Sequence, residues 1–187
     1  MFLRENEVGG RVAPFLAPRQ TVLDVGAGTG FISRWLRDRV GVRPTLTDVV
    51  PYDNRERSLP FLELTDPFSV PVGDASFDVV LLLFVLHHVD RHEDQERLIE
   101  EGTRIARTRL IVMEDTPRTR VDLAFNTAWD WLLNRRHGVP TPFTFRSPDQ
   151  WVDAFKEHDL SIVHVDTYRP WWPTLFSYPH TLFVLDR

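Results

Sequence analysis

The stretch TVLDVGAGTGFISRWL, residues 21–36, decides the fold. A short apolar run that reads as a buried strand passes through Asp24 and ends at a turn containing Gly26, Gly28 and Gly30. A helix is expected after the turn, because apolar residues recur there at helical spacing: Phe31, Ile32, Trp35 and Leu36. Such a turn presents free backbone N–H groups at a helix N-terminus, and glycines let a ligand approach them closely. We therefore expect a ligand here.

The glycine spacing separates two classes of ligand. Dinucleotide sites favour G-x-G-x-x-G, whereas this turn reads G-x-G-x-G. Asp24 lies two residues before the first glycine, where its negative charge disfavours a pyrophosphate. A ligand with a cationic amino-acid part tolerates this carboxylate. An NAD-dependent oxidoreductase is therefore the weaker alternative.

Short apolar runs alternate with helical periodicity along the rest of the chain, which predicts an α/β fold. The run at 76–86 is apolar almost throughout, as in a central parallel strand covered on both faces. Helices are predicted at 2–17, after the glycines, at 91–106, within 117–146, and from Ser147, which forms a capping box with Gln150. The predicted strands are 21–25, 43–48, 60–66, 76–86, 108–115, 160–168 and 180–187.

Composition excludes several kinds of protein. The 187 residues suggest one domain, 1–187, and the absence of cysteine excludes disulfides and thiolate metal sites. The formal net charge is −5 and the arginines are scattered, so no nucleic-acid footprint is visible. The polar N-terminus does not resemble a signal peptide, and the apolar run at 79–86 is too short to span a bilayer. We expect a cytoplasmic protein with no nucleic-acid or membrane partner.

Four landmarks in order resemble one family. VLDVGAGTG is similar to motif I of the class I S-adenosylmethionine (SAM)-dependent methyltransferases, and Asp48 and Asp66 end the next two predicted strands, where that family keeps acidic residues. VPVGDASFDVV at 70–80 and LLLFVLHHVD at 81–90 resemble the family's entry into strand four and the segment after it. The resemblance covers roughly residues 20–115 and the strand pair at the C-terminus.

The resemblance implies a three-layer Rossmann-like fold with a seven-stranded mixed sheet whose last strand is antiparallel. It implies SAM as cofactor and S-adenosylhomocysteine as product, with Asp48 at the ribose hydroxyls and Asp66 at the adenine amino group. Taken alone, either aspartate reads equally well as a turn or cap residue. Pro67 and the short span 66–76 depart from the family pattern, and we expect its usual helix to be missing there. The expected cofactor-binding residues are Asp24, Gly26, Ala27, Gly28, Gly30, Asp48, Val49, Asp66, Pro67, Leu82 and Leu83.

The chemistry demands few specific side chains. The methyl group of SAM is already activated, so a general base helps only when the acceptor must lose a proton. His87 and His88 follow strand four at the binding edge, where a histidine could act as a base near neutral pH. The resemblance makes His88 the better candidate, because the family often has a histidine at that place. The competing interpretation is that one caps a helix and the other packs. Glu114 and Asp115 end strand five at the same edge, but nothing has metal-ligand spacing, and we expect no metal.

Two segments are expected to select the acceptor: a lid-like insertion at about 117–146 and the loop 169–179. The insertion has an apolar stripe, with Asp122, Asn126 and Asp130 on its other faces. If strand six is parallel, both segments overhang the cofactor and predict an apolar or aromatic small-molecule pocket. The alternative is that the aromatic residues only pack the lid onto the sheet. The candidate substrate-binding residues are Trp129, Trp171, Trp172 and Tyr178.

The sequence thus predicts transfer of a methyl group from SAM to the O, N or C atom of a small organic acceptor. No Asn/Asp-Pro-Pro-Tyr/Phe run follows strand four, which disfavours the DNA and glutamine substrates of the family's amino-methylating enzymes. A non-catalytic SAM-binding or interaction protein remains an alternative, because methyl transfer needs no signature residue. Either a monomer or a homodimer fits the sequence.

Overall fold

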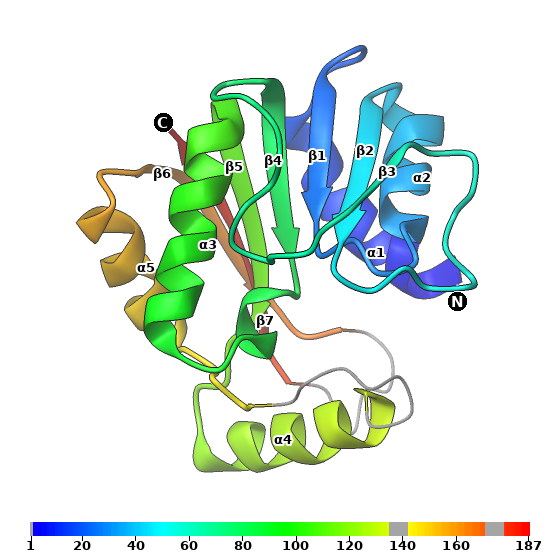
Figure 1. Ribbon diagram of the computed structural model, residues 1–187. Coiled ribbons are helices and arrows are strands. Elements are labelled where there is room, and N and C mark those ends of the chain that lie inside the picture. Colours follow the sequence, from blue (N-terminus) through cyan, green and yellow to red (C-terminus); the bar gives the residue numbers. More distant parts are fainter. Residues whose placement is uncertain (1, 135–141, 171–177) are drawn as a thin grey trace.

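A computed structural model describes residues 2–134, 142–170 and 178–187. Its centre is a seven-stranded sheet in the order β3-β2-β1-β4-β5-β7-β6 (Figure 1). The strands are β1 (Thr21–Val25), β2 (Arg43–Asp48), β3 (Phe61–Glu63), β4 (Phe77–Leu83), β5 (Ala106–Asp115), β6 (Ser161–Tyr168) and β7 (His180–Asp186).

Strand directions bring the ends of several strands to one edge. The first five strands pair in parallel, whereas β7 runs antiparallel to both β5 and β6. This confirms the predicted mixed sheet with an antiparallel last strand, and it also makes β6 parallel to β5. The amino end of β7 therefore meets the carboxyl ends of the other strands, and His180 pairs with Asp115 in the last rung of the ladder.

Alternating side chains on the central strands build two cores. Val79 and Leu81 of β4 belong to a cluster with α1 (Phe2–Val12) and α2 (Phe31–Val40). Val80 and Leu82 belong to a second cluster with α3 (His92–Ile105) and α5 (Pro148–Glu157) on the opposite face. Both faces of β4 are thus covered, which explains why its sequence is continuously apolar. The three predicted layers are confirmed.

The helices largely follow the sequence signals. The leading helix is α1 followed by the 3₁₀ turn η1 (Ala13–Phe15), because Pro14 cannot donate the hydrogen bond that an α-helix requires. Ser147 caps α5 as predicted: its hydroxyl accepts from the Gln150 backbone N–H and the Gln150 side chain accepts from the Ser147 N–H. A further helix, α4 (Arg120–Asn134), crosses below the carboxyl ends of the strands (Figure 1).

Two predicted strands are too long. The third strand ends at Glu63 rather than at Asp66, which lies exposed in a bend and accepts a hydrogen bond from the Phe68 N–H. Pro67 removes the donor that a longer strand would need. The fourth strand ends at Leu83, because Phe84 adopts a positive φ and leaves the extended conformation. Between 66 and 76 the structure has turns and bends instead of a helix, as predicted.

No helix within residues 2–134, 142–170 and 178–187 combines the length and the apolar character needed to cross a membrane.

The helix start at Gly30 predicts a sharp effect of substitution. A Cβ at Gly30 would lie 2.3 Å from the buried Leu46 Cδ1, and the φ of +72° disfavours any side chain. We expect Gly30→Ala to lower the free energy of unfolding by roughly 3 kcal/mol in urea titrations. Gly10→Ala in α1 is the matched control, because its Cβ meets open space, and alanine there should stabilise by about 0.5 kcal/mol. Equal stability of Gly30→Ala and the unmodified protein would contradict this packing.

Candidate functional site

The three glycines of the turn have different tasks. All three have a positive φ, but a Cβ at Gly26 would lie 2.3 Å from Val85 Cγ2, and one at Gly30 would collide with Leu46. Only Gly28 faces open space, with nothing within 4 Å of the Cβ position. Gly26 and Gly30 therefore permit close packing of the chain on itself. At Gly28 the space beside the backbone is open.

Asp48 ties this turn to the end of β2. Its Oδ2 accepts a hydrogen bond from the Gly28 N–H at 2.8 Å, and its Oδ1 accepts from the Val50 N–H at 2.9 Å. Each carboxylate oxygen retains capacity for another donor, such as a ribose hydroxyl. Tyr52, which the sequence analysis missed, lies half-buried near Asp48, and both burial and the Asp48 charge raise the pKa of its phenol. Val49, beside Asp48, is 44 % exposed.

Asp24 lies beneath the turn instead of in front of it. The carboxylate is buried and accepts a hydrogen bond from the Ser33 hydroxyl of α2 at 2.6 Å. Burial raises its pKa to about 7, the hydrogen bond from Ser33 opposes this rise, and the negative charge of Asp48 adds to it. Asp24 thus loses or gains its proton near neutral pH.

The other predicted cofactor residues lie in several environments. Leu82 and Leu83 have buried side chains in opposite cores, so only their backbone groups are available at the edge. The Ala27 N–H donates to the Thr47 carbonyl and supports the turn from below. Asp66 and Pro67 lie beyond the short β3, exposed and half-buried respectively.

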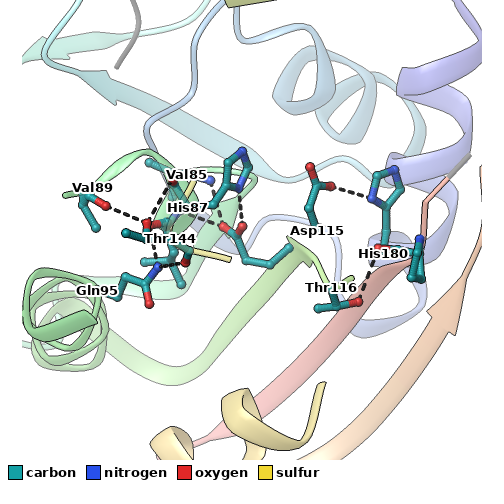
Figure 2. Close-up of polar contacts among 11 residues, drawn as sticks. Val85, His87, Val89, Gln95, Asp115, Thr116, Thr144 and His180 are labelled. Atoms are coloured by element: carbon teal, nitrogen blue, oxygen red, sulfur yellow. Dashed lines mark hydrogen bonds and ion pairs between the residues drawn. The ribbon is translucent and has the colours of Figure 1, made fainter. Parts of the chain in front are cut away.

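The segment after β4 is held by a buried carboxylate. Oε1 of Glu114 accepts from the backbone N–H groups of Val85 and Leu86 at 2.9 and 2.7 Å, while Oε2 lies 2.5 Å from His87 Nδ1 (Figure 2). Both side chains are buried, with the His87 ring in the 3₁₀ turn η2 (Leu86–His88). His87 therefore supports the backbone after β4. The ring of His88 lies 4.2 Å from that of His87 between centroids and is half-exposed.

Distant segments hold η2 from its other side. The Gln95 amide of α3 donates to the carbonyls of Leu86 and Thr144 at 3.0 and 2.7 Å. The Thr144 hydroxyl donates to the carbonyls of His87 and Val89 at 3.2 and 2.7 Å (Figure 2). The segment that precedes α5 is thus fastened to the turn after β4.

A second histidine–carboxylate pair lies beside the first. Nδ1 of His180 at the start of β7 is 2.6 Å from Oδ1 of Asp115 at the end of β5 (Figure 2). Burial, the largest single influence, would raise the pKa of Asp115, but His180, His87 and Arg4 together hold the pKa below its ordinary value, with His180 contributing most of the lowering. Asp115 therefore stays ionised at neutral pH.

Aromatic rings surround His180 on three sides. Phe84, Tyr178 and Tyr168 contact its ring edge to face, with centroids 5.0, 5.2 and 5.5 Å away. Phe84 has a φ of +58°, a conformation that a bulky side chain rarely adopts and that clusters at functional sites. Its ring lies under the guanidinium of Arg4 in α1. Of the predicted substrate residues, Tyr178 thus lies at this edge.

The helix α4 turns two polar side chains inward. Its polar residues Asp122 and Asn126 are buried, whereas Val121 is 72 % exposed and lines a surface hollow with Arg120, Ala124, Phe125 and Ala128. Asp122 turns inward because it pairs with Arg169, just after β6, at 2.8 Å. Asp122 and Asn126 thus lie away from the stripe residues Val121, Phe125 and Ala128, as predicted, and it is this polar face that is buried. Trp129 belongs to α4, and Trp171 and Trp172 lie outside the described residues.

Asn126 is a buried polar group without a hydrogen-bond partner among the described residues. Its residue is fully buried, and neither its amide nitrogen nor its carbonyl oxygen has a hydrogen-bond partner within the described part of the chain. Such a group costs free energy unless something satisfies it.

Asp24 generates a pH-dependent prediction. Its pKa of about 7 in the folded protein exceeds the ordinary 3.8, so its contribution to stability is lost as pH rises from about 4 to 7. Asp24→Asn should therefore gain stability relative to the unmodified protein as pH rises from 5 to 8, by up to about 2.7 kcal/mol in urea titrations. Asp38→Asn, at an exposed position of α2, should show no such trend. A difference that is constant between pH 5 and 8 would contradict the raised pKa.

Comparison with known proteins identifies the family. The family model described as "Methyltransferase domain" matches residues 4–165. No sequence among the curated proteins matches the chain.

Solved structures share the fold at low sequence identity. A chain of the Haloferax volcanii complex between the Trm112 methyltransferase activator and a methyltransferase superposes with a TM-score of 0.74 at 19 % identity, covering 98 % of this chain and 90 % of that one. A Methanosarcina mazei SAM-dependent methyltransferase gives 0.74 at 16 % identity, covering 95 % and 96 %. The Burkholderia thailandensis 1,6-didemethyltoxoflavin-N1-methyltransferase, solved with its substrate and S-adenosylhomocysteine, gives 0.71 at 16 % identity, covering 98 % and 77 %.

The family model spans most of the chain. The protein therefore belongs to the methyltransferase domain family and is a SAM-dependent methyltransferase.

Proposed function

We propose that the enzyme methylates a small organic acceptor with a flat or apolar body at the carboxyl edge of the sheet. The observation that carries this proposal is the ring cluster of Phe84, Tyr168, Tyr178 and His180. Aromatic walls with a few polar groups are typical of small-molecule sites. The net charge of −5 disfavours a nucleic-acid acceptor. The Burkholderia thailandensis relative, whose substrate is 1,6-didemethyltoxoflavin, gives further support.

The residues around the glycine turn are proposed to hold SAM, which supplies an activated methyl group when bound. Gly28 leaves the necessary space, and Asp48 accepts hydrogen bonds from the ribose hydroxyls. The exposed Val49 and the segment at Asp66 and Pro67 flank the adenine end.

The burial of the side chains at the end of β4 and in η2 suggests how these residues contribute to the site. Because Leu82 and Leu83 bury their side chains, their backbone carbonyls serve the methionine end. His87 holds the turn after β4, and His88 lies at the rim of the site.

The inward face of α4 suggests that the acceptor also carries a polar group. Asn126 can donate and accept a hydrogen bond but has neither partner in the described structure. A bound acceptor that satisfied this amide would recover the free energy that its burial costs. The acceptor therefore combines an apolar or aromatic body with at least one hydrogen-bonding group.

Methyl-labelled SAM tests the size class of the acceptor. The purified enzyme is incubated with labelled SAM and with three fractions of a cell extract: small molecules, proteins and nucleic acids. We expect label in the small-molecule fraction and none in the other two. Label confined to protein or nucleic acid would overturn the small-acceptor proposal. Absence of label in all three, with SAM bound in calorimetry, would favour a non-catalytic SAM-binding protein.

Asp48 provides a test of the cofactor assignment. We expect Asp48→Ala to weaken SAM binding at least tenfold in titration calorimetry, because both the ribose contact and the restraint on Gly28 are lost. Asp53→Ala, on the exposed segment after β2, should leave the affinity within twofold. The ribose assignment is wrong if Asp48→Ala also stays within twofold while its thermal unfolding is unchanged.

Substitution of Asn126 tests whether its buried amide binds the acceptor or is only a consequence of packing. Asn126→Leu removes an unpaired buried amide and should raise the free energy of unfolding by about 1 kcal/mol. The same variant should transfer methyl groups to the labelled small molecule at least tenfold more slowly, with SAM affinity unchanged. Val121→Asn, on the outward face of α4, is the control and should alter neither rate nor SAM binding. Full activity of Asn126→Leu would remove this residue from the acceptor site.

A further inference from the structure

The Asp115–His180 pair has the arrangement of a proton acceptor. Nδ1 of His180 faces the Asp115 carboxylate at 2.6 Å, although the ring N–H is not aligned along the line between the two atoms. A carboxylate at Nδ1 favours the tautomer with its proton on that nitrogen. Nε2 then carries the lone pair, and it has no hydrogen-bond partner among residues 2–134, 142–170 and 178–187.

The Asp115–His180 pair also lies where the methyl acceptor is proposed to bind. Asp115 ends β5 and His180 begins β7, so both lie at the edge where the glycine turn and α4 meet the sheet (Figures 1 and 2). The strained Phe84 presses its ring against His180 directly after β4. Residues held in such a conformation cluster at functional sites.

Several charged and titratable groups face the pair. Asp115 interacts with His87 of η2 and Arg4 of α1, and His180 contacts Tyr168 of β6 and Tyr178. Burial raises the pKa of the Tyr168 phenol well above its ordinary value, and the negative charge of Glu7 adds to the rise, so this phenol stays protonated. Asp115 is therefore the anion nearest to His180 among the described residues.

We propose that His180, positioned by Asp115, accepts the proton that the methyl acceptor loses, and that the acceptor is consequently an O–H or N–H compound. This rests on the proposed function. The acceptor's O–H or N–H bond breaks and an N–H bond forms at His180 Nε2, while the acceptor atom gains the methyl group and the sulfonium becomes a neutral thioether. The imidazolium afterwards returns its proton to water. Asp115 stays ionised and acts only by orienting the ring.

The tautomer of His180 tests the proposal without cofactor or acceptor. In protein labelled with ¹⁵N-histidine, long-range ¹H–¹⁵N spectra distinguish a protonated nitrogen from one with a lone pair. We expect a proton on Nδ1 and a lone pair on Nε2 near pH 8, and loss of this preference in Asp115→Asn. A proton fixed on Nε2, or an imidazolium that persists to pH 9, overturns the proposal.

The pH dependence of methyl transfer gives a second, independent test. With the small molecule labelled above, single-turnover transfer by His180→Gln should fall at least 100-fold at pH 7. The deficit should shrink as pH rises, because the acceptor then loses its proton to solvent. His164→Gln, an exposed histidine on β6, should match the unmodified enzyme. A deficit below threefold, one that is constant with pH, or a product methylated on carbon or sulfur overturns the proposal.

Failure of this proposal can be distinguished from failure of the proposed function. If no small molecule is labelled, the small-acceptor proposal fails, and the tautomer of His180 still decides whether the ring is arranged as a base. If a small molecule is labelled and His180→Gln transfers normally, only the role of His180 fails. Thermal unfolding and SAM affinity of His180→Gln establish that the variant is folded. If His180→Gln is unfolded, the histidine spectra of the unmodified protein and of Asp115→Asn decide whether His180 has the tautomer that a base requires.

Discussion

The turn after β4 depends on one buried carboxylate. Glu114 is fully buried and accepts hydrogen bonds from two successive backbone N–H groups and from His87. Those N–H groups belong to a segment that leaves the strand and cannot find partners in the sheet ladder. Without Glu114, the site would contain unsatisfied backbone donors where water is largely excluded. A residue of β5, Glu114, therefore determines the path of the backbone at Val85.

This constraint extends to the glycine turn and to the segment before α5. Val85 lies so close to Gly26 that a Cβ at Gly26 would overlap its side chain. Glu114 fixes the position of Val85, and Val85 in turn leaves no room for a side chain at Gly26. On the other side, Gln95 and Thr144 join η2 to α3 and to the chain before α5. Segments far apart in the sequence are in this way held around one short turn.

The sequence predicted the architecture well because local signals and burial agree. Motif I, the apolar β4 and the capping box at Ser147 each appear in the structure at their predicted positions. Strand ends were less predictable, since Asp66 and Phe84 leave the extended conformation through turn geometry and a positive φ that composition does not reveal. For α4 the sequence predicted an apolar stripe but not which face is buried, and the buried Asp122 pairs with the distant Arg169. Hydrophobic periodicity alone does not contain that contact.

The candidate site was predicted only where a motif marks it. Asp48 and the glycines were found from their spacing, whereas His180 stood at the start of an ordinary apolar strand. Its place becomes visible only when the antiparallel pairing of β7 with β5 sets it against Asp115. Consecutive residues of a strand point to opposite faces of the sheet, so Glu114 and Asp115 serve two different neighbours. One carboxylate faces η2 and fixes the backbone, while the other faces the ring cluster around Phe84 and Tyr168, and a single strand end thereby supports both the turn after β4 and the side chains beside it.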